Sequence, residues 1–399
     1  MKQWESMIKM ILTKKQEEGL KIAVERYKNR EKYTCIAGYA GTGKSTLVKF
    51  IVAALGVPEE AVCYAPFTGK AAQVLLKKGN KNVITLHKLL YHSILQPDGT
   101  FIRYPVNSVD YSIVIVDEVS MAPKSLMRLL FSYNVHVICL GDPFQLPTIE
   151  KKEDNGLLAS PHIFLDEVMR QATESEIIRL TMDIRHGKPI QYNSNGKEVL
   201  VLPKTHLNTG MYTWADQIIV GTNLTRISVN NQVRDMLGKK GTLAEGDKVI
   251  CLKNYWDYFA DNEDPLVNGT IGYVKNNFNS YIKLPNWLGG QNIDITITNF
   301  ISDSGADFGN LSFDTHMILT GEKCVDWQTA YKINRSKNYK GILPLEFTYG
   351  YAITCHKAQG SEFDKVLVLE EGFPYNKEEH ARWLYTACTR ASEKLVLIR

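Results

Sequence analysis

The chain has 399 residues, of which 44% are hydrophobic, so it is long enough to form two or three domains. Its formal net charge of +4 is compatible with a nucleic-acid partner but does not indicate one. Its seven cysteines include no C-x-x-C pair, which argues for reduced thiols and against a disulfide framework, a zinc module or an iron–sulfur cluster. Because no apolar run approaches membrane-spanning length and no signal-peptide core is present, we expect a soluble intracellular protein.

The first element is an amphipathic helix expected over Leu12–Tyr27, with Thr13 at its start. It places Gln16 a short distance upstream of a glycine-rich stretch, where its amide could hydrogen-bond an adenine. Taken alone, however, Gln16 is better explained as a solvated position on the helix.

The glycine-rich stretch Gly38–Thr46 matches G-x-x-x-x-G-K-[ST] in full. A buried strand is expected before it over Tyr33–Ala37, and a helix after it over Leu47–Leu55. This context surrounds an anion with backbone N–H groups and a positive helix end, so we expect a nucleotide site rather than a chance turn. Lys44 is expected to reach the β- and γ-phosphates, and the Ser45 hydroxyl to ligate Mg²⁺. The nucleotide-binding residues of this loop are predicted to be Gly38, Gly41, Thr42, Gly43, Lys44, Ser45 and Thr46.

Strand and helix patterns alternate after this loop, which predicts a parallel sheet covered on both faces. The strand Ala61–Ala65 leads into a loop with Thr68, at the edge where open α/β sheets bind ligands. Thr85 has the sequence context of a helix N-cap, and a lone His87 is more often structural than phosphate-binding. Asp98-Gly99 between two short extended runs predicts a β-hairpin that does not fit the alternation.

Two further strand ends carry candidate chemistry. The buried strand Ile113–Val116 is followed by Asp117, which is expected to hold Mg²⁺, and by Glu118, which is expected to polarise the attacking water. The strand Val137–Leu140 ends in a Gly-Asp-Pro turn that presents Gln145, a candidate sensor of the γ-phosphate.

The second half begins with another α/β pattern, including a core strand expected over Gln217–Asn223 and a helix over Leu224–Leu237. From Gly246 to about Lys340 short alternating runs separated by Gly, Asn and Pro predict a small all-β insertion. Within it, Gly305–Tyr339 has too little periodicity to assign elements. The α/β pattern resumes before the end of the chain.

The order of these motifs resembles the superfamily 1 DNA helicases of the 5′-to-3′ group, which includes RecD and the phage Dda helicase. The resemblance spans nearly the whole chain and is carried by Gly38–Thr46, Thr68–Ala72, Val116–Met121, Leu140–Pro147, Tyr351–Glu362 and Tyr385–Arg390. It implies an α/β fold of two RecA-like P-loop motor domains, with a small β-hairpin insertion in the first and an SH3-like β insertion in the second. The implied first motor domain is 1–150, with the hairpin at about 93–110; the second is 151–245 and 341–399, interrupted by the insertion 246–340.

The resemblance also assigns roles to individual residues. The implied catalytic residues are Lys44, Asp117, Glu118, Gln145 and two arginine fingers, Arg170 and Arg390. Ser45 and Asp117 would hold Mg²⁺, while Gln16, Gly360 and Glu362 would join the phosphate loop in binding ATP. The single-stranded nucleic-acid track would be lined by Pro66, Phe67, Thr68, Thr85, His87, Phe101, Thr222, Asn223, Thr354 and His356.

The function implied by the resemblance is that of an ATP-dependent DNA helicase that translocates 5′-to-3′ on single-stranded DNA and unwinds 5′-tailed duplexes. It would act as a monomer in the cytoplasm of a bacterial or phage-infected cell, beside replication, recombination or repair proteins. The short insertions favour this polarity, because the 3′-to-5′ group carries long helical ones. Two alternatives stay open: an RNA helicase, since the motor motifs do not sense a 2′-hydroxyl, and an ATP-switched single-strand clamp that does not unwind.

Overall fold

The computed structural model describes residues 12–95, 101–147, 154–169, 174–261, 265–336, 339, 341–372 and 376–399. They form an α/β protein that divides into two compact units. The first unit comprises Met1–Tyr91, Pro105–Leu207 and Ala358–Arg399, and the second comprises His92–Tyr104 and Asn208–Lys357. Within the described residues, no helix is both long enough and apolar enough to cross a membrane.

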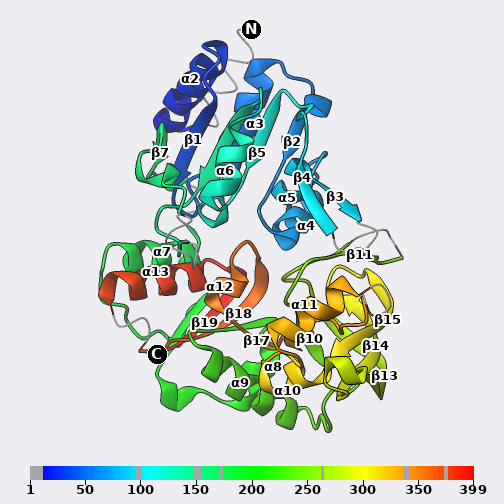
Figure 1. Cartoon of the computed structure of the whole chain (residues 1–399). Helices are drawn as coiled ribbons and strands as arrows, with labels where there is room; N and C mark the ends of the chain where they lie inside the picture. Colours follow the sequence, from blue (N-terminus) through cyan, green and yellow to red (C-terminus); the bar gives the residue numbers. More distant parts are fainter. Residues whose placement is uncertain are drawn as a thin grey trace. The chain divides into compact units, whose positions relative to one another are not determined.

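The described part of the first unit contains a five-stranded parallel sheet in the order β2-β5-β6-β1-β7, as the alternating pattern predicted. Successive residues of a strand face opposite sides, so Val114 and Cys139 lie in one core while Ile115 and Leu140 lie in the other. Helices alternate with these strands along the chain (Figure 1). The bounds are α2 Lys14–Lys28, β1 Tyr33–Gly38, α3 Lys44–Leu55, β2 Val62–Tyr64, α4 Gly69–Lys77, α5 Leu86–Leu90, β5 Ile113–Val116, α6 Lys124–Leu130, β6 His136–Gly141 and β7 Ile163–Leu165.

Three further strands of the first unit run in parallel, with β19 paired to both β18 and β8. Helix α7 precedes β8, and helix α13 connects β18 to β19. The bounds are α7 Glu176–Arg185, β8 Val199–Leu202, β18 Phe363–Leu369, α13 Lys377–Cys388 and β19 Ala391–Ile398, with short 3₁₀ turns at Glu59–Ala61, Val119–Met121, Leu157–Ala159 and Lys204–His206.

The second unit combines a parallel pair, β9 and β17, with an antiparallel sheet in the order β15-β14-β13-β10-β16. The pairs β11–β12 and β3–β4 are separate two-stranded sheets, and β3–β4 lies where the sequence predicted a hairpin. The bounds are β3 Tyr91–Leu95, β4 Phe101–Pro105, α8 Thr209–Trp214, β9 Gln217–Val220, α9 Asn223–Met236, β10 Lys248–Cys251, β11 Tyr255–Phe259, β12 Pro265–Leu266, β13 Ile271–Lys283, β14 Asn292–Ser302, β15 Asp307–Asp314, α10 Thr315–Thr320, α11 Trp327–Arg335, β16 Phe347–Tyr349, β17 Ala352–Thr354 and α12 Cys355–Ala358.

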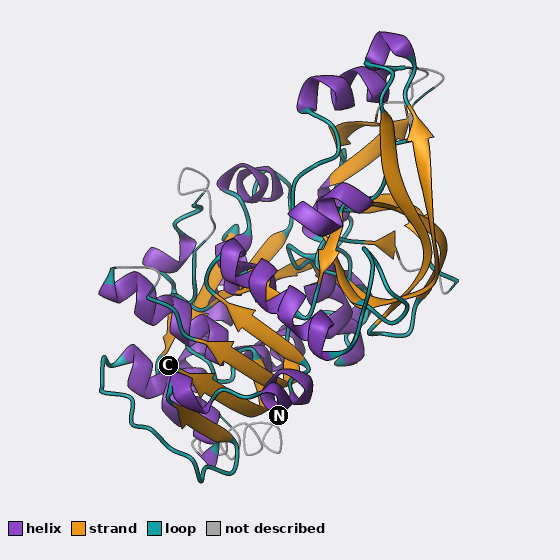
Figure 2. Ribbon diagram, turned by 90° about the horizontal axis from the view of Figure 1, so that it is seen from below, coloured by secondary structure: helices purple, strands orange, loops and turns teal. Residues whose placement is uncertain are grey.

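The insertion differs from the all-β expectation, because the segment that the sequence left unassigned contains β15, α10 and α11. Helix α11 packs its buried Ile333 into a small apolar core with Leu288 and Ile293 from the region of β13 and β14. The long strands β13 and β14 are curved (Figure 2). The SH3-like assignment and the boundaries at 150, 245 and 340 stay predictions.

A buried ion pair stabilises the second unit. Arg234 on α9 contacts both carboxylate oxygens of Asp247, with its Nε 3.1 Å from Oδ1 and 3.2 Å from Oδ2. The Tyr351 hydroxyl donates to Asp247 at 3.0 Å, and the Arg234 guanidinium lies 4.4 Å from the ring centroid of Tyr349. The Asp247 side chain is fully buried, so its charge depends on these partners.

Replacing Asp247 with Ala should therefore leave the Arg234 cation buried without its anion. Breaking a buried pair in this way costs about 3–5 kcal/mol of stability. Urea denaturation should show a clear loss of midpoint for Asp247→Ala and little change for the control Asp183→Ala, whose partner Lys188 is solvent-exposed. Equal midpoints for the two variants would contradict this account of the pair.

Candidate active site

The phosphate loop connects the end of β1 to the first residue of α3, and its backbone requires glycine. Gly41 and Gly43 both have a φ of +76°, a left-handed conformation that side chains disfavour. A Cβ on Gly38 would lie only 2.7 Å from the Thr42 hydroxyl oxygen. Lys44 folds back over the loop, and its Nζ donates to the carbonyl oxygens of Gly38 at 2.7 Å and Tyr39 at 3.1 Å. The loop is thus a tight backbone cradle with one cation above it, which fits a bound polyphosphate.

Gln16 is buried beneath this loop, with 1% of its surface exposed, so its interpretation as a solvated helix position is wrong. Its Nε2 donates to the Thr42 carbonyl oxygen at 3.1 Å, and its Oε1 accepts from the Thr13 N–H at 2.9 Å. Thr13 in turn caps α2 by accepting from the Gln16 N–H, which completes a capping box. A Cβ on Gly43 would lie 2.5 Å from the Gln16 amide nitrogen. The contact of Gln16 with adenine stays a prediction.

The acidic pair follows β5 directly. The Glu118 N–H donates to Asp117 Oδ1 at 2.8 Å, and Glu118 has a φ of 50°, an uncommon left-handed conformation for a residue with a side chain. Such strain is found where a neighbouring structure holds a functional side chain in place. Burial, together with the charge of Glu118, raises the pKa of Asp117, whereas the charge of Lys44 opposes this rise.

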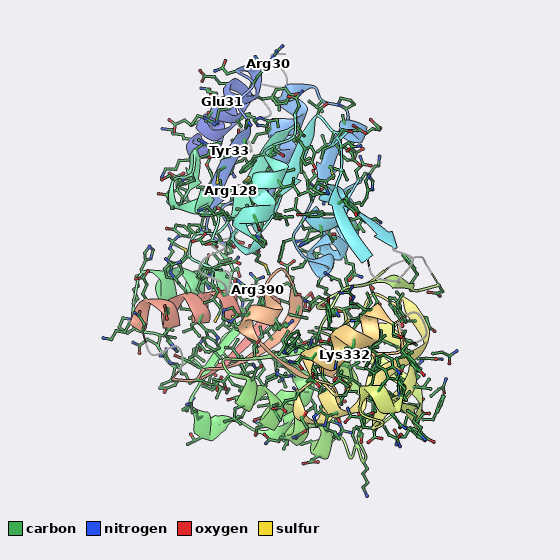
Figure 3. All side chains as sticks on the ribbon, viewed as in Figure 1. Arg30, Glu31, Tyr33, Arg128, Lys332 and Arg390 are labelled. Atoms are coloured by element: carbon green, nitrogen blue, oxygen red, sulfur yellow. The ribbon has the colours of Figure 1, made fainter. Side chains whose placement is uncertain are left out.

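Gln145 joins the predicted base to one of the predicted arginine fingers. With its amide oriented to satisfy both neighbours, Gln145 donates to Glu118 Oε2 at 3.2 Å and accepts from Arg390 Nη2 at 3.3 Å. Arg390, labelled in Figure 3, is buried with 6% exposure, and its Nε and Nη1 donate to the carbonyl oxygens of Thr386 and Ser361. The folded chain therefore brings together a carboxylate, an amide and a guanidinium that are up to 272 positions apart.

Tyr385 and Asp142 form a second connection to the phosphate loop. The Tyr385 hydroxyl donates to Asp142 Oδ2 at 2.6 Å and accepts from the Ala40 N–H at 2.8 Å. Burial raises the pKa of Asp142, which is 1% exposed. Nearby, the Leu146 N–H donates to the Thr386 hydroxyl, and Gln359 donates to the Leu146 carbonyl oxygen. The segment 358–399 is thereby fixed to the turn that carries Gln145.

A cavity of about 220 Å³ lies beside these groups in the first unit. Its lining includes six residues that the sequence assigned to ATP, Mg²⁺ or catalysis, namely Ser45, Asp117, Glu118, Gly360, Glu362 and Arg390. One hydroxyl and one carboxylate suit Mg²⁺, which binds through one or two protein oxygens plus substrate phosphates. Among the described residues no group of three His, Cys, Asp or Glu side chains could hold a metal by itself. The donor set thus fits a metal that arrives with a nucleotide.

Two predicted residues cannot be placed in this site. Arg170 lies outside the described residues, and Phe101 is described only by its backbone in β4. Glu362, predicted to help bind ATP, forms an ion pair with Lys78 at 3.0 Å, and both residues line the cavity.

In the first unit, the residues predicted to line the nucleic-acid track include a row of aromatic rings. Phe67 and His87 have ring centroids 5.4 Å apart, and His87 stacks on Tyr91 at 6.5 Å. All three residues are half-buried, and Phe67 and Tyr91 also pack against the apolar core. Such rings can stack on nucleic-acid bases, and Tyr91 had no sequence motif to reveal it.

Other predicted track residues have a structural role in the fold. Thr68, Thr85 and Thr222 are N-caps of α4, α5 and α9, and each hydroxyl accepts a backbone N–H. Because Thr222 caps α9, the strand expected over 217–223 ends at Val220 instead, and Asn223 begins the helix. The remaining predicted track residues lie at strand ends or nearby, with Pro66 after β2, Thr354 at the end of β17 and His356 in α12.

Two family models match parts of the chain. Residues 12–198 match the family described as an AAA domain, and residues 349–398 match the UvrD-like helicase C-terminal domain. The ATP-dependent RecD2 DNA helicase of Deinococcus radiodurans is 28% identical over 392 residues, covering 90% of this chain and 46% of the relative. The ATP-dependent DNA helicase dda of Enterobacteria phage T4 is 28% identical over 189 residues, covering 44% of this chain and 43% of the relative.

The chain is similar to the superfamily 1 helicases of the group that includes RecD and Dda. It spans less than half of the length of either relative. A structure of Pif1 helicases on forked double-stranded DNA has a TM-score of 0.53 over 97% of this chain and 92% of that one. At 18% identity this likeness shows that the two proteins share a fold.

Four residues that hold the site together could not be identified from the sequence: Asp142, Tyr385, Gln359 and Thr386. Each lies inside a motif that had been recognised, so a signal was present in the sequence. Their partners are distant in the chain, however, and the pairing could not be inferred from spacing.

Replacing Tyr385 with Phe keeps the ring and removes only the hydroxyl. Asp142 then loses one of its two donors and the Ala40 N–H loses an acceptor, and leaving a buried polar atom unpaired costs about 1–3 kcal/mol. We expect a lower melting temperature and weaker binding of a fluorescent ATP analogue. The control Tyr192→Phe, at an exposed loop position, should change neither quantity. A wild-type melting temperature and affinity in Tyr385→Phe would show that this bridge is not needed.

Proposed function

We propose that the chain is an ATP-dependent DNA helicase that translocates 5′-to-3′ on single-stranded DNA and unwinds duplexes. The observation that carries the proposal is the hydrogen-bonded series Glu118–Gln145–Arg390 beside the phosphate loop. It combines a proton acceptor, a group that can sense or orient the reacting atoms, and a cation for the developing charge. A protein that only bound nucleotide would not need all three.

In the proposed reaction, water attacks the γ-phosphorus of ATP and releases ADP and phosphate. Glu118 accepts the proton of the attacking water, and Gln145 orients the water or the γ-phosphate. Lys44 leaves the loop carbonyls to contact the β- and γ-phosphates, and Arg390 stabilises the charge of the transition state. When bound, Mg²⁺ neutralises charge on the phosphate oxygens, and Ser45 and Asp117 are the side chains that would hold it.

Arg390 also couples ATP hydrolysis to displacement of the C-terminal segment. It lies between α13 and β19, and its carbonyl contacts at Thr386 and Ser361 belong to the same C-terminal segment. Loss of the γ-phosphate would therefore shift Gln145 and Arg390. The hydrogen bonds of Thr386 and Gln359 would transmit this shift to the segment 358–399. We propose that this coupling drives each step along the strand.

The proposed substrate is single-stranded DNA next to a 5′-tailed duplex. The row Phe67–His87–Tyr91 can stack on bases of any sequence, and this would suit a translocating motor. Both curated relatives are named as ATP-dependent DNA helicases, which supports DNA over RNA. The polarity rests on the resemblance to the RecD and Dda group and on the short insertions of this chain.

The catalytic assignment predicts that Glu118→Gln still binds ATP but hydrolyses it poorly. Removing a general base lowers a rate by about 10²–10⁴-fold. A steady-state ATPase assay with oligo-dT should give this loss of kcat, while the exposed control Glu59→Gln keeps the wild-type rate. Turnover at the wild-type rate by Glu118→Gln would assign the base to another residue.

The polarity predicts strand release from duplexes with a 5′ single-stranded tail, in the presence of ATP and Mg²⁺, and little release from 3′-tailed or blunt duplexes. Matched DNA substrates with a trap strand, resolved on gels, measure this directly. A preference for 3′ tails would overturn the polarity alone. Release only from RNA-tailed substrates would favour the RNA helicase, and DNA-stimulated ATPase with no release from any duplex would favour the clamp.

A further inference from the structure

Arg185, the last residue of α7, contacts the phosphate loop directly. Its guanidinium carbon lies 3.6 Å from the ring centroid of Tyr39, the second residue of the loop. The Phe164 ring also contacts the Tyr39 ring, in a T-shaped arrangement with ring centroids 5.3 Å apart. A cation at this distance from an aromatic face is well placed for a cation–π interaction. The contact therefore fixes the position of Arg185 relative to the loop.

The nitrogen atoms at the edge of the Arg185 guanidinium do not all have hydrogen-bond partners among the described residues. Nη2 lies 3.2 Å from Nε2 of the neighbouring His186, whereas Nη1 is buried and has no hydrogen-bond partner among the described residues. Stacking through the face leaves the N–H groups directed along the plane of the group, where they can reach an anion. A buried cationic N–H without an acceptor is unfavourable, so it calls for an explanation.

Arg185 contacts the same loop residue as Lys44 does. The Tyr39 carbonyl oxygen accepts from Lys44 Nζ, the group expected to reach the β- and γ-phosphates. The positive charge of Arg185 also opposes the rise in the pKa of Tyr385, the residue that holds the Ala40 N–H and Asp142. Gln16 contacts the loop at Thr42, by contrast, and belongs to its predicted adenine end.

We propose that Arg185 is a third arginine of the nucleotide site, which stacks on Tyr39 and donates from Nη1 to the γ-phosphate of ATP. The inference rests on the proposed function, because it requires that the loop binds ATP. Arg185 would thus distinguish ATP from ADP, in addition to Lys44, Gln145 and Arg390. Its place on α7 would give that helix its own response to the presence of the γ-phosphate.

The test compares the binding of two fluorescent nucleotides, mant-ATPγS and mant-ADP, with Mg²⁺ present. The variants are Arg185→Ala, Arg185→Lys and the control Arg179→Ala, which removes an exposed arginine from the same helix. Loss of a charge-assisted hydrogen bond should weaken mant-ATPγS binding about tenfold or more in Arg185→Ala. The affinity for mant-ADP should change less than about twofold, and Arg179→Ala should match the wild type.

Arg185→Lys keeps the charge but loses the planar stack, so its affinity for mant-ATPγS should lie between those of Arg185→Ala and the wild type. Circular dichroism shows whether Arg185→Ala folds. If it does not, Arg185→Lys still tests the contact with the γ-phosphate. Equal weakening of both nucleotides, or no weakening of either, would overturn the contact with the γ-phosphate. A wild-type protein that binds neither nucleotide and hydrolyses no ATP would instead overturn the proposed function.

Discussion

Tyr385 donates its phenolic hydrogen to Asp142 and accepts the N–H of Ala40, and the arrangement of the candidate site depends on this pair of hydrogen bonds. Ala40 belongs to the phosphate loop, Asp142 to the turn after β6, and Tyr385 to helix α13. Without the bridge, the loop would lack its link to the helix that leads to Arg390. Because Asp142 and Tyr385 are both buried, losing this hydrogen bond would be costly.

Several other buried polar groups of the site also connect distant segments of the chain through hydrogen bonds. Gln16 satisfies the Thr42 carbonyl oxygen, Gln145 joins Glu118 to Arg390, and Gln359 holds the Leu146 carbonyl oxygen. Three amide side chains thus act as connectors, since each can donate and accept at once. Burial together with strain at Glu118 makes the site less stable than an apolar core would be, and such a cost is expected where groups must be held ready for chemistry.

The second unit shows how an insertion can be stabilised away from the main sheets. Its long strands β13 and β14 end in a small apolar core that includes Ile333 of α11. Helix α11 covers this core, which is one reason that the insertion is not all-β. Trp327 and Tyr331 lie one turn apart on α11 and remain exposed, so the helix is amphipathic but carries large rings on its outer face.

The sequence alone determined the elements whose signals are local: the buried strand Ile113–Val116, the glycine-rich loop with Lys44, and the parallel α/β pattern of the first unit. These follow from side-chain volume, β-branching and the backbone freedom of glycine, which act over a few residues. Only the tertiary structure decided the burial of Gln16, the bridge through Tyr385 and the stacking of Arg185 on Tyr39. These contacts join positions far apart in the chain, and a polar residue looks the same in a sequence whether it is solvated or buried with partners.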